Sequence, residues 1–111
     1  MLYYSTDPKV ETVVSRREAN RQKVESMMPS IIMDARREAK RVRDEIMRPY
    51  WNAPDEYFVK NPNAAEKWYN DLCSEYDKFC WGFAESLAHN NFPWLTKDAM
   101  DKVKERIYDK L

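Results

Sequence analysis

The stretch VESMMPSIIMDA, residues 24–35, decides the fold, because its one proline either bends or breaks a long helix. A break would be followed by a helical hairpin, whose connection usually contains glycine or asparagine in a left-handed conformation. Residues 26–28 provide neither. Met28 precedes the proline, is biased away from helical backbone angles and therefore favours the break. We predict that Pro29 bends one helix over residues 8–48, and the hairpin is the alternative.

Outward from this stretch, the signals of a single helix continue in both directions. Asp7 can cap a helix that begins at Pro8, and the first proline after Pro29 is Pro49. At ~1.5 Å per residue, such a helix would be ~60 Å long, about twice the diameter of a compact domain of this size. Apolar side chains recur with a spacing of eleven residues, a coiled-coil-like pattern, at Val13, Val24, Ala35 and Ile46.

The next segments predict a connector and a second helix. Residues 49–62 are rich in proline and aromatic side chains, which predicts an aromatic elbow without regular structure. The helix expected over residues 63–90 has Asn63 and Glu66 as a capping-box pair at its start. Asn90 and Asn91 can supply a left-handed stop at its end. Its apolar stripe consists of Ala65, Tyr69, Leu72, Tyr76, Phe79, Phe83 and Leu87.

A last helix is expected over residues 96–110, with Thr96 as its N-cap. Its apolar face consists of Met100, Val103, Ile107 and Leu111. No strand pattern competes. The sequence therefore predicts an all-α fold in a single helical domain of residues 1–111, with an extended kinked N-terminal helix, an aromatic-rich connector and a C-terminal helical hairpin.

Composition excludes several classes of function. The chain has 111 residues and one glycine, so it has no Gly-rich phosphate loop and no dinucleotide-binding fingerprint. Its 19 basic and 19 acidic residues balance, which removes the bulk electrostatic attraction to nucleic acid or an anionic membrane. The balance is uneven along the chain, because residues 1–50 carry a net charge of +3 and residues 51–111 carry −3.

The residues with chemical potential do not form a reactive set. His89 and Glu85 lie four apart on one helix face, but a single histidine does not complete a typical zinc or di-iron site. Cys73 and Cys80 are seven residues apart, ~10 Å along a helix, too far to form a disulfide with each other. Cys80 and His89 are separated by ~14 Å of helix rise and cannot act as a nucleophile and base pair. We expect no enzyme activity, no cofactor and no metal.

The chain lacks the features of a targeting or membrane segment. No stretch reaches the ~20 apolar residues that a membrane-spanning helix needs. The first seven residues, MLYYSTD, have neither the basic nor the apolar region of a signal peptide. We expect an intracellular protein, soluble or peripheral. A mitochondrial or other organellar location is compatible with this expectation, although no targeting signal indicates it.

These observations favour a non-catalytic accessory or scaffold subunit of a larger protein assembly, for example an organellar multi-subunit complex. A ~60 Å helix exceeds what two shorter helices can cover, and Trp, Tyr, Met and Arg are enriched at interface centres. Arginine is suited to bidentate contacts with acidic surfaces. The expected partner-binding residues are Arg16, Arg17, Arg21, Arg36, Arg37, Arg41, Trp51, Tyr57, Phe58 and Trp94.

Other interpretations remain open at this stage. The aromatic side chains can instead fill the core of the chain itself, and the chain can self-associate. The arginine clusters of the first helix can neutralise phosphates, which is typical of a nucleic-acid-binding protein. The alternative function is therefore a small compact regulator, either a phage-type inhibitor of a host protein or a nucleic-acid-binding protein.

Overall fold

The computed structural model describes the backbone of residues 8–111 and the side chains of residues 15–111. Within these residues the fold is all-α, as predicted, and has no strand. Four helices follow one another: α1 (Pro8–Trp51), α2 (Asp55–Lys60), α3 (Pro62–Asn91) and α4 (Lys97–Lys110). The cap expected from Asp7 lies outside the described residues.

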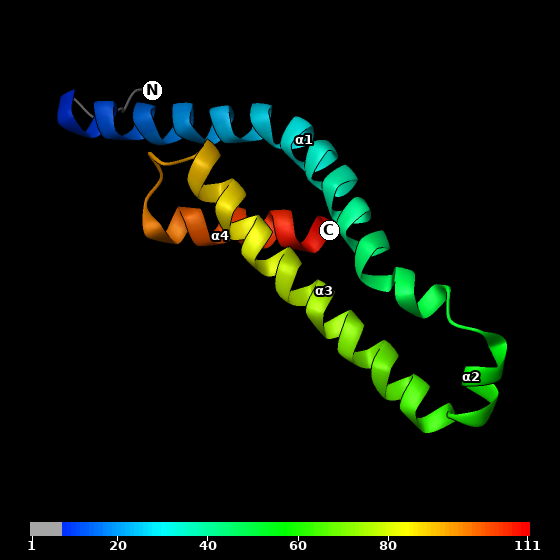
Figure 1. Cartoon of the computed structure of the whole chain (residues 1–111). Helices are drawn as coiled ribbons and strands as arrows, with labels where there is room; N and C mark the ends of the chain where they lie inside the picture. Colours follow the sequence, from blue (N-terminus) through cyan, green and yellow to red (C-terminus); the bar gives the residue numbers. More distant parts are fainter. Residues whose placement is uncertain (1–7) are drawn as a thin grey trace.

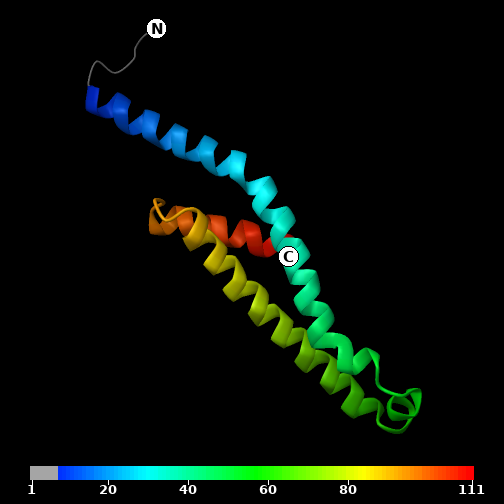
Figure 2. The ribbon, with the colours of Figure 1, turned by 45° about the horizontal axis from the view of Figure 1, so that its top comes forward.

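The helix α1 runs through Pro29 without a break and bends in its cyan part, the part of the chain around Pro29 (Figure 1). The bend follows from proline chemistry, because Pro29 has no N–H to donate to the Glu25 carbonyl and its ring crowds that oxygen. Around the bend α1 packs against α4 and the end of α3, and its second half runs beside the rest of α3 (Figure 2). The extended, kinked first helix is therefore confirmed, and the hairpin alternative is wrong.

The first helix also extends beyond its predicted end at residue 48, through Pro49 to Trp51. A proline in the last turn of a helix costs only one hydrogen bond, since it does not prevent the following residues from donating backward. The Asn52 N–H donates to the Arg48 carbonyl at 3.0 Å and closes this turn. The aromatic connector is correspondingly shorter than predicted, and it contains the six-residue helix α2.

The core forms where three helices meet. The first half of α1 contributes Val24 and Met28, which contact side chains of α3 and α4. Phe92, directly after α3, is fully buried and lies at the α3–α4 turn. The predicted apolar face of α4 is confirmed, because Met100, Val103 and Ile107 are buried and Leu111 is half-buried. The buried core residues are Val24, Met28, Ala84, Ala88, Phe92, Met100, Val103 and Ile107.

The predicted stripe of α3 is confirmed in part. Ala65 is buried, five further members are half-buried, and Tyr69 is 44% exposed. The fully buried line lies one position further along the helix, at Cys80, Ala84 and Ala88. The physical reason is that α3 packs against both α1 and α4, and small side chains allow two helices to approach closely while the aromatic ones lie at the flank. Cys80 is a buried free thiol and Cys73 an exposed one.

The predicted bounds of α3, 63–90, agree with the structure to within one residue at each end, but the two caps predicted for it are wrong, and the cap predicted for α4 is confirmed. The helix α3 begins at Pro62 with Asn61 as N-cap, so Asn63 and Glu66 do not form a capping box. No residue of the described chain has a left-handed backbone, so α3 does not end as predicted at its two asparagines. It ends because Phe92 turns into the core at φ −130° and Pro93 follows. Thr96 caps α4 as predicted, its hydroxyl oxygen accepting from the Ala99 N–H at 3.3 Å.

The molecule is a bent rod. Its principal extents are 75 × 23 × 22 Å and its radius of gyration is 21.4 Å. A compact domain of about 100 residues has a radius of gyration of about 13 Å. The difference arises because α1 is longer than any element that could fold back over it.

Small-angle scattering of the purified monomer tests this shape. We expect a radius of gyration close to the 21.4 Å of the structure and a pair-distance distribution with a long tail. Light scattering on the same sample controls for dimers, which would also raise the value. A monomer with a radius near the compact value of about 13 Å would contradict an extended α1.

The close approach at Ala88, which is 0% exposed, predicts that this position does not accept a larger side chain. Ala88→Leu should lower the free energy of unfolding by about 1–3 kcal/mol, because the added carbons overpack the core. Ser86→Leu places the same side chain on the exposed face of α3 and should change it by less than about 0.5 kcal/mol. Urea unfolding of both variants measures the difference. Equal effects would mean that α1 and α4 do not pack against α3 here.

Candidate partner-binding surface

A groove of about 700 Å³ lies between the first half of α1 and the start of α4. One wall comes from α1, and the other comes from the α3–α4 turn and α4. The groove exists because the part of α1 that precedes Val24 extends past the hairpin formed by α3 and α4. Every residue from 15 to 23 is exposed. Its lining residues are Arg17, Asn20, Arg21, Val24, Glu25, Trp94, Leu95, Thr96, Asp98, Ala99, Lys102, Val103 and Arg106.

The floor of the groove is apolar and is held by the core. Val24 and Val103 are buried members of the core, and Leu95 packs against it. Trp94 is 36% exposed, and its ring contacts Phe92 edge to face with the ring centroids 5.8 Å apart. The Lys23 ammonium lies 4.8 Å from the centroid of the Trp94 ring, a cation–π distance. Trp94 is therefore held in place, with part of its ring open to the groove.

The rim of the groove is charged, and one ion pair spans it. Arg106 of α4 donates from Nη1 to Glu25 Oε1 at 2.6 Å and from Nη2 to Oε2 at 3.1 Å. Arg21 donates to Glu18 at 2.8 Å. Within residues 15–111, Arg17 and Lys102 make no ion pair. Asp98 in the lining makes no ion pair among the described residues either, so the two cations leave the rim with only a small net positive charge, which an acidic group can approach.

The Glu25–Arg106 pair also affects the acid–base behaviour of both groups. Hydrogen bonds from Arg106, and the charges of Arg106 and Arg21, hold the pKa of the Glu25 carboxyl below its usual range. The same hydrogen bonds raise the pKa of Arg106. Glu25 is therefore a carboxylate at neutral pH, and its pair connects the first half of α1 to α4.

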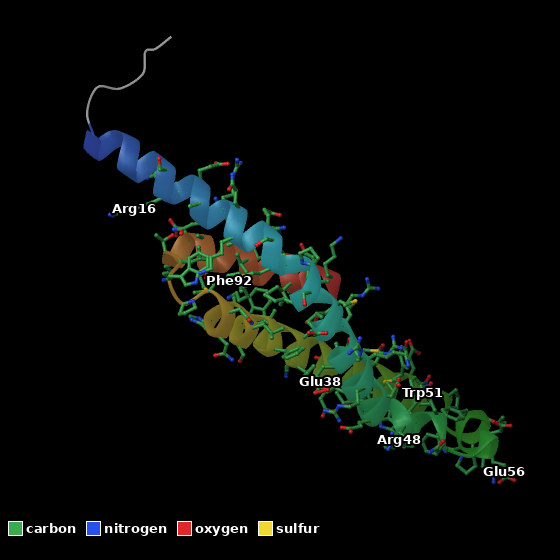
Figure 3. The ribbon with its side chains drawn as sticks, turned by 90° about the horizontal axis from the view of Figure 1, so that it is seen from above. Arg16, Glu38, Arg48, Trp51, Glu56 and Phe92 are labelled. Carbon is green, nitrogen blue, oxygen red and sulfur yellow. The ribbon has the colours of Figure 1, made fainter. Side chains whose placement is uncertain are left out.

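Three of the expected partner-binding residues come together at this groove. Arg17 and Arg21 line it from α1, and Trp94 lines it from the turn, 73 to 77 positions later in the sequence. Arg16 is exposed on the same half of α1, outside the lining (Figure 3). The sequence indicated these residues separately but did not indicate that they share a surface.

The remaining expected arginines lie farther along α1. Arg36 and Arg37 line a second, smaller hollow beside Tyr76. Arg41 is on another side of the helix, where its guanidinium contacts Glu38 at 2.6 Å and Glu45 at 2.5 Å. Arg41 is thus engaged within its own helix, whereas the other two arginines lie beside a cavity.

The expected aromatic residues of the elbow lie at the other end of the rod, far from the groove (Figure 3). Tyr57 and Phe58 are half-buried within an aromatic cluster of this chain, which Tyr50 and Trp68 complete at centroid distances of 5.0 to 5.7 Å. Trp51 is 54% exposed. Tyr57 and Phe58 therefore mainly close the turn between α1 and α3, and of the three expected aromatic residues only Trp51 is largely exposed.

Sequence reasoning missed the α4 side of the groove. Lys102 and Arg106 lie in a lysine-rich region with no distinctive motif. The partner of Arg106 is Glu25, which is 81 residues away, so no local spacing could have connected them. Leu95 was missed as well, because it follows Trp94 in a turn that has no periodicity.

From residue 15 onward, no three His, Cys, Asp or Glu side chains lie close enough to hold a metal ion. In the same range no polar or charged residue is buried. None of the helices of the described chain combines the length and the apolar character needed to cross a membrane.

Comparison with known proteins does not add to this picture. The chain has no significant match among protein-family models, curated proteins or solved structures. The functional assignment therefore rests on the groove, the exposed aromatic residues and the distribution of charge.

The Glu25–Arg106 pair predicts a specific pH dependence of stability. Because the pKa of folded Glu25 is lowered, the pair stabilises the fold above the unfolded pKa of about 4.3, and this stabilisation is lost as the pH falls through the folded pKa. Glu25→Gln should therefore be less stable than the wild type near pH 7, and the difference should vanish as the pH falls through the folded pKa of Glu25. Urea midpoints at neutral and at acid pH measure the effect.

Glu105→Gln is the matched control for this experiment, because it removes the same charge from the exposed side of α4 without breaking the Glu25–Arg106 pair. The difference between wild type and Glu25→Gln should also shrink in about 1 M salt, which screens exposed pairs. A difference that is the same at both pH values, or equal in the two variants, would show that Glu25 and Arg106 are not paired in solution.

Proposed function

We propose that the chain is a non-catalytic accessory or scaffold subunit, which binds a protein partner in the groove between α1 and α4. The observation that carries this proposal is the groove itself, with an apolar floor that includes Trp94 and a rim that includes Arg17 and Lys102. Tryptophan and arginine are the side chains most enriched among residues that dominate binding energy. An apolar floor with a polar rim is also the usual anatomy of a protein interface.

The chemistry of the groove suggests what the partner presents. An apolar side chain would cover the open part of Trp94 and the floor formed by Leu95 and Val103. A carboxylate beside it would pair with Arg17 or Lys102, which make no ion pair among the described residues. An acidic segment with apolar side chains on one face satisfies both requirements.

The extended shape supports a scaffold role in particular. The groove and the exposed Trp51 lie toward opposite ends of a molecule 75 Å long. Two contact points at that separation allow one chain to touch two neighbours, or two distant points of one neighbour. A 44-residue helix supplies the reach between them.

The alternative functions have less support. A compact regulator such as a phage-type inhibitor agrees poorly with a radius of gyration of 21.4 Å. Binding of nucleic acid along α1 is opposed by acidic side chains on the same helix, since Arg21 and Arg41 are already paired with Glu18, Glu38 and Glu45. A phosphate backbone would have to displace these carboxylates.

The test is to follow a tagged chain in extracts of the cells that encode it. We expect the wild type to sediment with a particle much larger than the 13.4 kDa of the chain. Trp94→Ala should shift most of the chain to the free fraction, because removal of a central tryptophan costs about 2 kcal/mol or more in binding. Lysine-directed cross-linking in the intact particle should connect Lys102 to another protein.

Trp81→Ala is the matched control, since Trp81 is 42% exposed on α3 and does not line the groove. This variant should stay in the particle. Lys67, on α3 outside the groove, is the control for cross-linking. A wild-type chain that sediments as a free monomer would contradict the proposed function. Loss of the particle in both tryptophan variants would contradict the assignment of the groove.

A further inference from the structure

A second hollow, separate from the groove, is lined mainly by cations. It has a volume of about 420 Å³ and lies where the middle of α1 meets α3 and the residue after α4. Its six lining residues include no carboxylate side chain: Arg36, Arg37, Lys40, Arg43, Tyr76 and Leu111. The proposed protein-binding role uses none of these residues.

The cations gather there because of helical spacing. Arg36, Lys40 and Arg43 are four and three residues apart, so they share one flank of α1 over a rise of about 10 Å. Glu38 and Glu45 lie on the opposite flank, where Arg41 pairs with both of them. Charge is therefore separated around α1, with a basic flank toward Tyr76.

The carboxylates near the hollow neutralise only part of its charge. Asp44 approaches Lys40 at 3.3 Å and Arg43 at 4.0 Å. Asp34 approaches Arg37 at 3.9 Å. Two carboxylate side chains thus stand against four cations, with the main-chain oxygen of Leu111 as a further acceptor at the wall. Two of the three ion-pair contacts are too long for good hydrogen bonds. The remaining guanidinium and ammonium N–H groups are available to an anion.

Tyr76 adds a hydroxyl donor at the wall of the hollow. Its O–H donates to the Leu111 carbonyl at 3.5 Å, the outer limit of a hydrogen bond. Burial raises the pKa of Tyr76 to about 12, while the charge of Arg43 acts in the other direction. The hydroxyl is therefore protonated at neutral pH and can donate to an anion oxygen.

We propose that this hollow binds a compact oligophosphate, such as the di- or triphosphate group of a small ligand. Guanidinium groups match phosphate oxygens bidentately, and the ammonium of Lys40 adds a point charge between them. The basic flank is short, because the next positions along it are Met33 on one side and Met47 on the other. A short flank suits a compact anion and gives no continuous track for a nucleic-acid backbone.

Isothermal titration with inorganic tripolyphosphate, at low and at physiological salt, tests the proposal. The variant R36Q/K40Q/R43Q should bind about tenfold more weakly or worse, because it loses three charge-assisted contacts. Tyr76→Phe should bind severalfold more weakly, because only the hydroxyl donor is lost. Orthophosphate should bind more weakly than tripolyphosphate, since it reaches fewer of the four cations.

The control variant R16Q/K78Q/K97Q removes the same charge from exposed positions away from the hollow. It should retain wild-type affinity, and circular dichroism checks that both triple variants are folded. If the hollow variant unfolds, Arg36→Gln alone replaces it. Equal weakening in both triple variants, or no binding by the wild type, would overturn the proposal. A DNA duplex that binds the wild type more tightly than tripolyphosphate does, and that binds R36Q/K40Q/R43Q equally well, would also overturn the proposal. That result would indicate a nucleic-acid site elsewhere on α1.

Failure of this site is distinguishable from failure of the proposed function. The titration uses the isolated chain and a small anion, whereas the particle experiment depends on Trp94 and the groove. Trp94→Ala should leave tripolyphosphate binding unchanged. R36Q/K40Q/R43Q should leave the chain in the particle.

Discussion

The bend that Pro29 imposes on α1 is the constraint on which the rest of the structure depends. A straight helix of 44 residues would lie along one neighbour only. Because Pro29 removes one backbone hydrogen bond and crowds the preceding turn, the helix changes direction without ending. Its first half then reaches α4 through Val24 and Met28, and its second half follows α3. The groove lies between the half of α1 that precedes Pro29 and the start of α4.

The packing of α3 between two neighbours explains how a small chain supports this shape. Ala84 and Ala88 are fully buried, so α1 and α4 can both approach closely, and Phe92 fills the end of the core. The aromatic side chains that a single-sided helix would bury lie at the flank instead, and the rings of Phe79 and Phe83 stack with their centroids 5.2 Å apart. Much of the aromatic content is thus partly exposed, including Trp94 in the groove.

The charge of the chain is organised by the helices. The whole chain balances 19 basic against 19 acidic residues. Within α1, however, basic and acidic side chains gather on different sides of the helix. One flank pairs internally through Arg41, another approaches Tyr76, and Glu25 reaches across to Arg106. The same kind of side chain therefore has three roles, in helix stabilisation, in a basic hollow and in a tertiary ion pair, and only its place on the helix decides which.

By itself, the sequence determined the helical class, the Thr96 cap and the inward face of α4, and it favoured without deciding the continuity of the first helix through Pro29. All of these features depend on the spacing and backbone chemistry of residues that are close together in the sequence. Tertiary structure alone decided the buried line of α3, the end of that helix at Phe92 and the meeting of Arg17, Arg21 and Trp94 at one groove. These depend on which face a second and a third helix cover. A contact such as Glu25–Arg106, across 81 residues, leaves no periodic mark in the sequence.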